Sequence, residues 1–231
     1  MAKLLRLPTT RRLGASLSTP LRNLPRHSVD DWGRDPRFVE QASRLARLRW
    51  DVAVDGEQHL PRRGGALLVA SSRRYSLSAL FATLAIGEII DRPVRFVGRP
   101  DSAPVGDVLR RIGGLLARRD EIAGALRHHE IVLMTAAPTG HAREAGAVDH
   151  ALVAAAVATG VPVYPVATLS SRSSRAARVK IGPQVRPAHD RRGPLAEVEL
   201  ADATQRSLQR LLDALGLLRT GNPVIDLLAR N

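Results

Sequence analysis

The stretch GGALLVASSRRYSLSALF, residues 64–81, contains a strand, a polar turn and the start of a helix. Residues 67–69 form a continuous apolar run, which is typical of a strand in the interior of a parallel sheet. Two serines and two arginines follow at 71–74, and a mostly apolar helix is expected over 77–90. Ligands of α/β sheets bind outside the carboxyl ends of the strands, so residues 71–74 are expected to lie at a binding site.

Strands alternate with helices along the rest of the chain. Asp35 and Pro36 are suited to the cap and first turn of a helix, and Trp50, Val52 and Val54 then alternate with polar residues as in a strand. The expected fold class is α/β, with a largely parallel central sheet flanked by helices in one domain. Further helices are expected at 104–112, 119–128, 145–159 and 195–218, and further strands at 93–98, 115–117, 130–136, 161–168 and 177–185.

The chain is strongly basic and has no cysteine. Its 231 residues include 35 Lys and Arg against 22 Asp and Glu, a formal net charge of +13. This charge favours anionic partners, namely phosphate-bearing small molecules, anionic lipid head groups or nucleic acid. The lack of cysteine excludes disulfides, a thiol nucleophile and a thiolate metal site, and it is compatible with the cytoplasm.

Three regions are expected along the chain: a basic flexible arm at 1–29, the α/β domain at 30–219 and a tail at 220–231. The arm carries six basic residues and no acidic one, with three prolines that interrupt any long helix. It can be a solvated tail, or its leucines and arginines can rest on an anionic membrane surface. No transmembrane span is expected, because glycine and prolines break the longest uncharged run, 151–171. The expected location is cytoplasmic, including a peripheral position on the inner face of the cell membrane.

Arginine dominates the polar residues at the expected strand ends. Guanidinium groups suit phosphate oxygens because they donate two parallel charged hydrogen bonds. A pocket for a phosphate or phosphodiester is one interpretation of these arginines, and solvated surface arginines are the other. The residues concerned are Arg73, Arg74, Arg99, Arg118 and Arg119.

The order of the segments resembles the glycerolipid, or lysophospholipid, acyltransferase family, including its 1-acylglycerol-3-phosphate acyltransferases, over roughly residues 30 to 190. VDGEQHLPRRGGALLVASS at 54–72 resembles the entry strand pair of that family, which normally ends in Asn-His. RPVRFVGRPD at 92–101 resembles its second strand, and GGLLARR at 113–119 its second block. VPVYPV at 161–166 resembles the fourth block, and DDWGRDP at 30–36 resembles the leader of actinobacterial members.

The resemblance implies a fold, a reaction and a set of substrate-binding residues. The fold is of the glycerolphosphate acyltransferase type. The reaction is acyl transfer from acyl-CoA or acyl-carrier protein, as co-substrate, to a lysophospholipid or a glycerol phosphate, with no further cofactor and no metal. Arg119 and Arg99 fall at phosphate-holding positions, Arg73 assists them, and Arg143, at the end of the segment matching the third block, is counted with them.

Three functional positions of the family pattern are replaced in this chain. Its first block is a His followed after four residues by an Asp, which together remove the proton from the acceptor hydroxyl. Ser72 takes the place of the His, and Ser76 or Ser78 stands near the place of the Asp. LMTAAPTGHAR matches the third block, with Ala136 or Ala137 where that block has a Glu. Loss of a general base costs about 10²–10⁴ in rate.

His141 is the one histidine expected near the site, next to Arg143 and Glu144. It can serve as a replacement base, or it can be an exposed loop histidine. His128 and His129 are expected at the opposite, amino end of the sheet. A serine nucleophile at Ser72 is not favoured, because the Gly-x-Ser-x-Gly turn of the α/β hydrolases is missing.

Three functions therefore stay open. The first is glycerolipid acyl transfer, and the second is non-catalytic lipid binding or regulation by a protein of the same fold. Nucleic-acid binding is the third and least favoured, because aromatic residues make up only 3% of the chain and no DNA- or RNA-binding motif appears.

Overall fold

The computed structural model describes residues 29–215, except 75, 142, 172–173 and 187–192. The expected arm, apart from its last residue, and the expected tail therefore lie outside the described residues. Within them, the expected class is confirmed as a single α/β domain with a mostly parallel seven-stranded sheet.

The sheet has the strand order β1-β7-β6-β2-β5-β3-β4, and every neighbouring pair is parallel except β6 and β7. The strands are β1 (Asp51–Asp55), β2 (Ala66–Ala70), β3 (Val94–Val97), β4 (Gly114–Leu115), β5 (Ile131–Thr135), β6 (Val163–Ser170) and β7 (Ala176–Ile181). The helices are α1 (Pro36–Arg49), α2 (Ser78–Ile90), α3 (Val105–Arg111), α4 (Arg119–Arg127), α5 (His150–Thr159) and α6 (Pro194–Leu215), with a short 3-10 helix η1 at Glu57–His59.

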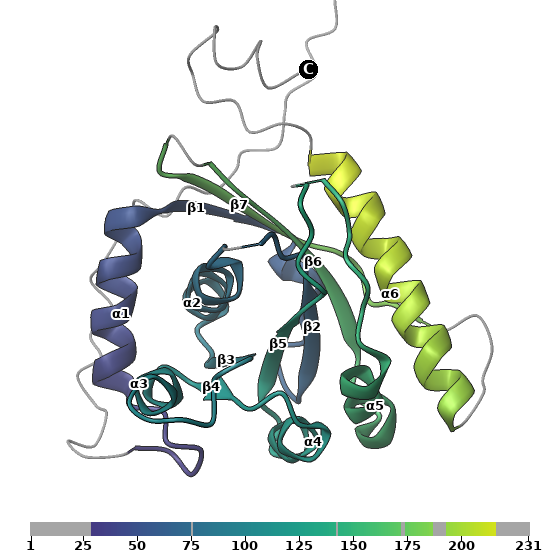
Figure 1. The fold of residues 1–231 in the computed structure, drawn as a ribbon, viewed down its shortest axis with the longest axis horizontal. Coiled ribbons are helices and arrows are strands. Elements are labelled where there is room, and N and C mark those ends of the chain that lie inside the picture. The colour runs from purple at the N-terminus through teal and green to yellow at the C-terminus, as the bar shows by residue number, and fades with distance from the viewer. Residues whose placement is uncertain (1–28, 75, 142, 172–173, 187–192, 216–231) are drawn as a thin grey trace, which may run out of the picture.

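Strand β2 is the centre of the core. All five of its residues are fully buried, and it lies between β5 and β6 in parallel register. Leu67 and Val69 pack on the side covered by α4, α5 and α6, whereas Leu68 packs on the side covered by α2. Figure 1 shows these helices on opposite sides of the curved sheet, with α1 outside α2. The apolar run of β2 is therefore explained by burial on both faces.

One expected helix start differs from the structure, and one expected helix end lies outside the described residues. The helix expected over 145–159 begins only at His150, where the Asp149 carboxylate accepts a hydrogen bond from the Ala151 N–H. Before it the chain crosses close to Ala137: a Cβ on Gly146 would lie 1.8 Å from the Ala137 carbonyl oxygen. The helix expected over 195–218 is observed to Leu215, and its last three positions lie outside the described residues.

Residues 30–35, which we call the leader clasp, cover the buried guanidinium of Arg95 on β3. One Asp30 oxygen accepts hydrogen bonds from the backbone N–H groups of Trp32 and Arg34, and the other lies 2.6 Å from Arg95 Nη2. Arg95 is 1% exposed and also contacts Glu130 at 3.0 Å. The Trp32 ring lies over the guanidinium at 5.9 Å. The clasp therefore gives the buried charge a carboxylate partner at Nη2, in addition to that of Glu130.

Asp35 ends the clasp and begins α1. Its carboxylate accepts hydrogen bonds from the backbone N–H groups of Arg37 and Phe38, as expected of a helix cap, and α1 has Pro36 at its first position. Arg111 at the end of α3 donates to the same carboxylate at 2.8 Å, which lowers the pKa of Asp35 below its ordinary value. This contact fixes the start of α1 against α3.

Removing Arg95 is expected to destabilise the protein strongly. An Arg95→Ala variant loses a fully buried side chain, together with its ion pairs to Asp30 and Glu130, and leaves a cavity at β3, which costs about 2 kcal/mol or more. Urea unfolding at neutral pH measures this loss. Arg44→Ala is the control, because Arg44 is 73% exposed and pairs with Glu40 on the same helix, so its loss costs about 0.5 kcal/mol or less. Equal stabilities of the two variants would contradict the role given to the clasp.

Candidate functional site

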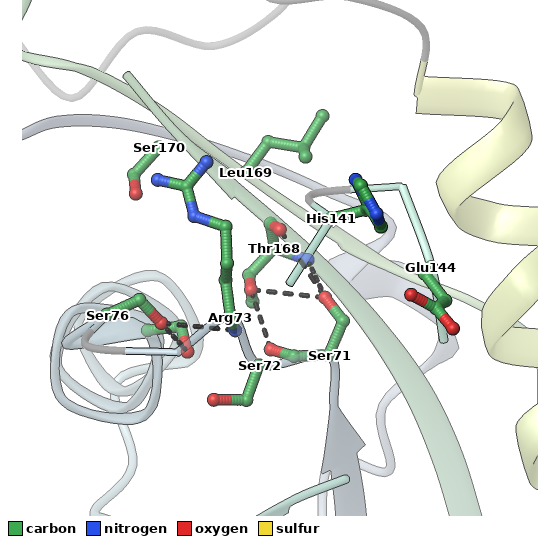
Figure 2. Close-up of a pocket in the computed structure, with 10 residues that line it drawn as sticks. Ser71, Ser72, Arg73, Ser76, His141, Glu144, Thr168, Leu169 and Ser170 are labelled. Carbon is green, nitrogen blue, oxygen red and sulfur yellow. Dashed lines mark hydrogen bonds between the residues drawn. The ribbon is translucent and has the colours of Figure 1, made fainter. Parts of the chain in front are cut away.

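A shallow pocket that is open to solvent lies at the carboxyl end of β2. Three segments that are distant in the sequence form it: the turn between β2 and α2, the loop after β5 and the carboxyl end of β6. Figure 2 shows Arg73 and Ser76 to one side, His141 and Glu144 to the other, and Ser71 and Thr168 between them. The lining residues are Ser71, Ser72, Arg73, Ser76, Ser78, His141, Glu144, Thr168, Leu169 and Ser170.

Ser71 and Thr168 join β2 to β6 at the base of the pocket. The Thr168 N–H donates to Ser71 Oγ at 2.8 Å, and Thr168 Oγ1 donates to the Ser71 carbonyl at 2.8 Å. Both residues are buried. Their hydroxyl groups therefore hold the pocket floor together, and Ser72 is the first residue after β2 that is not fully buried.

The serines of the turn bond to one another and to the backbone. Ser76 Oγ accepts a hydrogen bond from the Arg73 N–H at 3.3 Å and donates to Ser78 Oγ at 3.0 Å. Neither Ser76 nor Ser78 caps α2, because the helix begins after Leu77 with no side-chain cap hydrogen bond. Ser72, Ser76 and Ser78 do line one pocket, which brings together the positions that match the His and the Asp of the family pattern.

His141 and Glu144 line the opposite side of the same pocket. Both are exposed residues of the loop between β5 and α5. An imidazole is the side chain best suited to take up a proton near neutral pH, whereas a serine hydroxyl is not. The structure thus places a histidine in the pocket that contains Ser72, although from a different strand end than in the family pattern.

Of the arginines at the strand ends, some lie at the pocket and others pair with carboxylates away from it. Arg73 lines the pocket, whereas Arg99, Arg119 and Arg143 are not among its lining residues. Arg99 Nη2 lies 3.4 Å from Glu121, and Arg119 Nη2 lies 3.3 Å from Glu197 on α6. These carboxylates neutralise much of the positive charge that a phosphate would require. A role for Arg99, Arg119 and Arg143 in phosphate binding stays a prediction.

The contribution of β6 to the site was not predicted. Thr168, Leu169 and Ser170 reach the pocket because β6 lies directly beside β2 in the sheet. Their place at the carboxyl end of a buried strand was the available signal. Strand order, however, cannot be read from the alternation of strands and helices alone.

The described part of the chain holds neither a candidate metal site nor a candidate membrane-crossing helix. There, no three His, Asp or Glu side chains gather in a way that could hold a metal ion. Among the helices of the same residues, none combines the length and the apolar character needed to cross a bilayer.

The fold is similar to that of a known lipid-modifying enzyme. Over 79% of this chain and 81% of the other, it superposes with a TM-score of 0.57 on the crystal structure of the 1-acyl-sn-glycerophosphate (LPA) acyltransferase PlsC from Thermotoga maritima. No protein-family model and no curated sequence matches the chain. The two chains are 18% identical, and at this identity the similarity establishes the fold alone. This chain therefore has the PlsC acyltransferase fold.

Proposed function

We propose that the protein binds a phosphate-bearing glycerolipid and an acyl donor at the pocket beside β2 and transfers the acyl group between them. The observation that carries this proposal is that Arg73, Ser72 and His141 line a single pocket at the carboxyl end of a central strand, in the fold of an acyltransferase. The guanidinium offers charged hydrogen bonds to phosphate, and the imidazole offers a site for the proton of an acceptor hydroxyl.

The pocket suits a head group better than an acyl chain. Leu169 is its one apolar lining residue, and six of the other nine carry hydroxyl groups. The acceptor is therefore a lysophospholipid or glycerol phosphate whose polar end enters the pocket, and the donor is acyl-CoA or acyl-carrier protein.

Non-catalytic binding of the same lipid is the second candidate. It is favoured by the serines that occupy the positions of the His and the Asp in the family pattern, since Ser76 and Ser78 bond to each other and present no charge. In this case the protein recognises the lipid without transferring an acyl group. Nucleic-acid binding is not proposed, and no gel shift with DNA is expected at about 150 mM salt.

Lysophosphatidate binding tests the phosphate site. Arg73→Ala is expected to weaken binding about tenfold or more, because a hydrogen bond to a charged group is worth about 1.5–3 kcal/mol. Titration calorimetry measures the affinity. Arg62→Ala, in the exposed turn before β2, is the matched control, and Arg119→Ala tests the position that the family pattern indicates. A loss of affinity in Arg119→Ala but not in Arg73→Ala would place the phosphate outside the pocket.

The same wild-type protein, given lysophosphatidate and acyl-CoA or acyl-carrier protein, separates the two candidates. Formation of diacylated product identified by mass spectrometry establishes acyl transfer. Binding without product from either donor establishes the second candidate. If neither binding nor product is observed, the lipid proposal is wrong.

We further propose that the protein lies on an anionic membrane surface at the inner face of the cell membrane. Residues 37, 41, 44, 45 and 48 of α1 are exposed and follow one helical face, which combines two arginines with two leucines. Leu45 is 67% exposed and Leu48 is 72% exposed. Such a face binds the boundary of an anionic bilayer through apolar burial and charge attraction.

Vesicle sedimentation tests this surface. Leu45→Glu/Leu48→Glu is expected to reduce binding to vesicles that contain phosphatidylglycerol, because two buried leucines are lost and two negative charges are introduced. Leu195→Glu/Val198→Glu, a pair 64% and 44% exposed on α6, is the matched control and is expected to bind like the wild type. Equal binding of both double variants, or strong binding to neutral vesicles, would contradict a docking role for α1.

A further inference from the structure

The loop that carries His141 and Glu144 is hydrogen-bonded directly to the turn that carries Ser72. The Thr139 N–H donates to the Ser72 carbonyl at 3.1 Å, and the Arg74 N–H donates to the Thr139 carbonyl at 3.0 Å. The side chain of Thr139 then closes the loop on itself, since its Oγ1 lies 2.7 Å from the His141 carbonyl and 3.4 Å from that of Glu144. This end of the loop is thus fixed relative to Ser72.

Helix α6 holds the other end of the loop through Gln209. Gln209 Oε1 accepts a hydrogen bond from the Ala145 N–H at 2.9 Å, and Gln209 Nε2 donates to the Arg143 carbonyl at 3.0 Å. Next to it, Gly146 passes so close to the Ala137 carbonyl that no side chain fits there. Contacts at both ends therefore hold the described residues of this loop next to the pocket.

We infer that His141 is the proton acceptor of this site, in place of the histidine that Ser72 replaces, with Glu144 and Gln209 as its positioning residues. This inference rests on the proposed acyl transfer. The acceptor hydroxyl gives its proton to the neutral imidazole while its oxygen attacks the thioester carbonyl of the donor. The carbon–sulfur bond breaks, and the imidazolium returns the proton to the departing thiolate, so atoms and charges balance.

The charges around His141 fit this role. Glu144 and Arg73 are the two charged residues among the other residues that line the pocket. Glu144 lies on the same side of the pocket as His141 and presents a carboxylate to the site. Arg73 lies on the opposite side, where its guanidinium suits the phosphate of the substrate. The lining thus offers a cation for the phosphate and an imidazole for the proton on opposite sides of one pocket.

Kinetics of variant enzymes test the inference. His141→Ala is expected to lower kcat about 10²–10⁴-fold, with lysophosphatidate affinity unchanged, and to lose the acidic limb of the wild-type pH–rate profile. Added imidazole should restore part of its rate. Glu144→Gln and Gln209→Ala are expected to lower kcat less than His141→Ala does and to shift the acidic limb of the pH–rate profile. Gln209→Glu keeps the acceptor for the Ala145 N–H, so its effect on kcat should be smaller than that of Gln209→Ala. His59→Ala, in the exposed helix η1, is the matched histidine control and should behave like the wild type.

The outcomes separate the inference from the proposed function. If the wild type transfers acyl groups and His141→Ala does so at the same rate, with the same pH profile, the inference is wrong and the proposed function stands. If the wild type makes no product from either donor, the proposed acyl transfer is wrong and the inference falls with it. A slow His141→Ala enzyme that responds to imidazole supports both.

Discussion

The site depends on the fixed register of three parallel strands. Strand β2 is buried on both faces and bonded to β5 on one side and β6 on the other, so that Ala70 is paired with both Thr135 and Val166. Whatever follows these strands must therefore emerge at the same edge of the sheet. The Ser71–Thr168 hydrogen bonds extend this register by one residue beyond β2 and make the floor of the pocket. The chemistry of the site is then set by which side chains follow.

The leader clasp has a different role, which is to cover a buried charge on β3, next to the edge strand of the sheet. Arg95 occupies an interior position on β3 where an apolar side chain would be expected, and Asp30, Glu130 and the Trp32 ring surround its guanidinium. The sequence of residues 30–35 is thereby explained by a buried charge, and this segment positions the start of α1. The proposed membrane-facing helix is in this way tied to the sheet that carries the pocket.

Much of the fold could be predicted because burial acts on short stretches of sequence. The apolar run of β2, the Asp35 cap and the alternation of strands and helices were all local signals, and the structure confirms them. The site was harder to predict, because the partners of its charges are distant in sequence. Arg119 meets Glu197 from α6, and the His141 loop is braced by Gln209 from the same helix. The predicted start of α5 was wrong for a similar reason, since the close passage of Gly146 past Ala137 is a tertiary contact.

A crystal structure of the protein with bound lysophosphatidate tests the central claim most directly, namely that the pocket beside β2 receives the polar end of a phosphate-bearing glycerolipid. The account predicts phosphate oxygens within hydrogen-bond distance of the Arg73 guanidinium, and a glycerol hydroxyl on the side of His141 and Glu144. A phosphate bound between Arg99 and Arg119, with residues 71–78 untouched by the lipid, would contradict it.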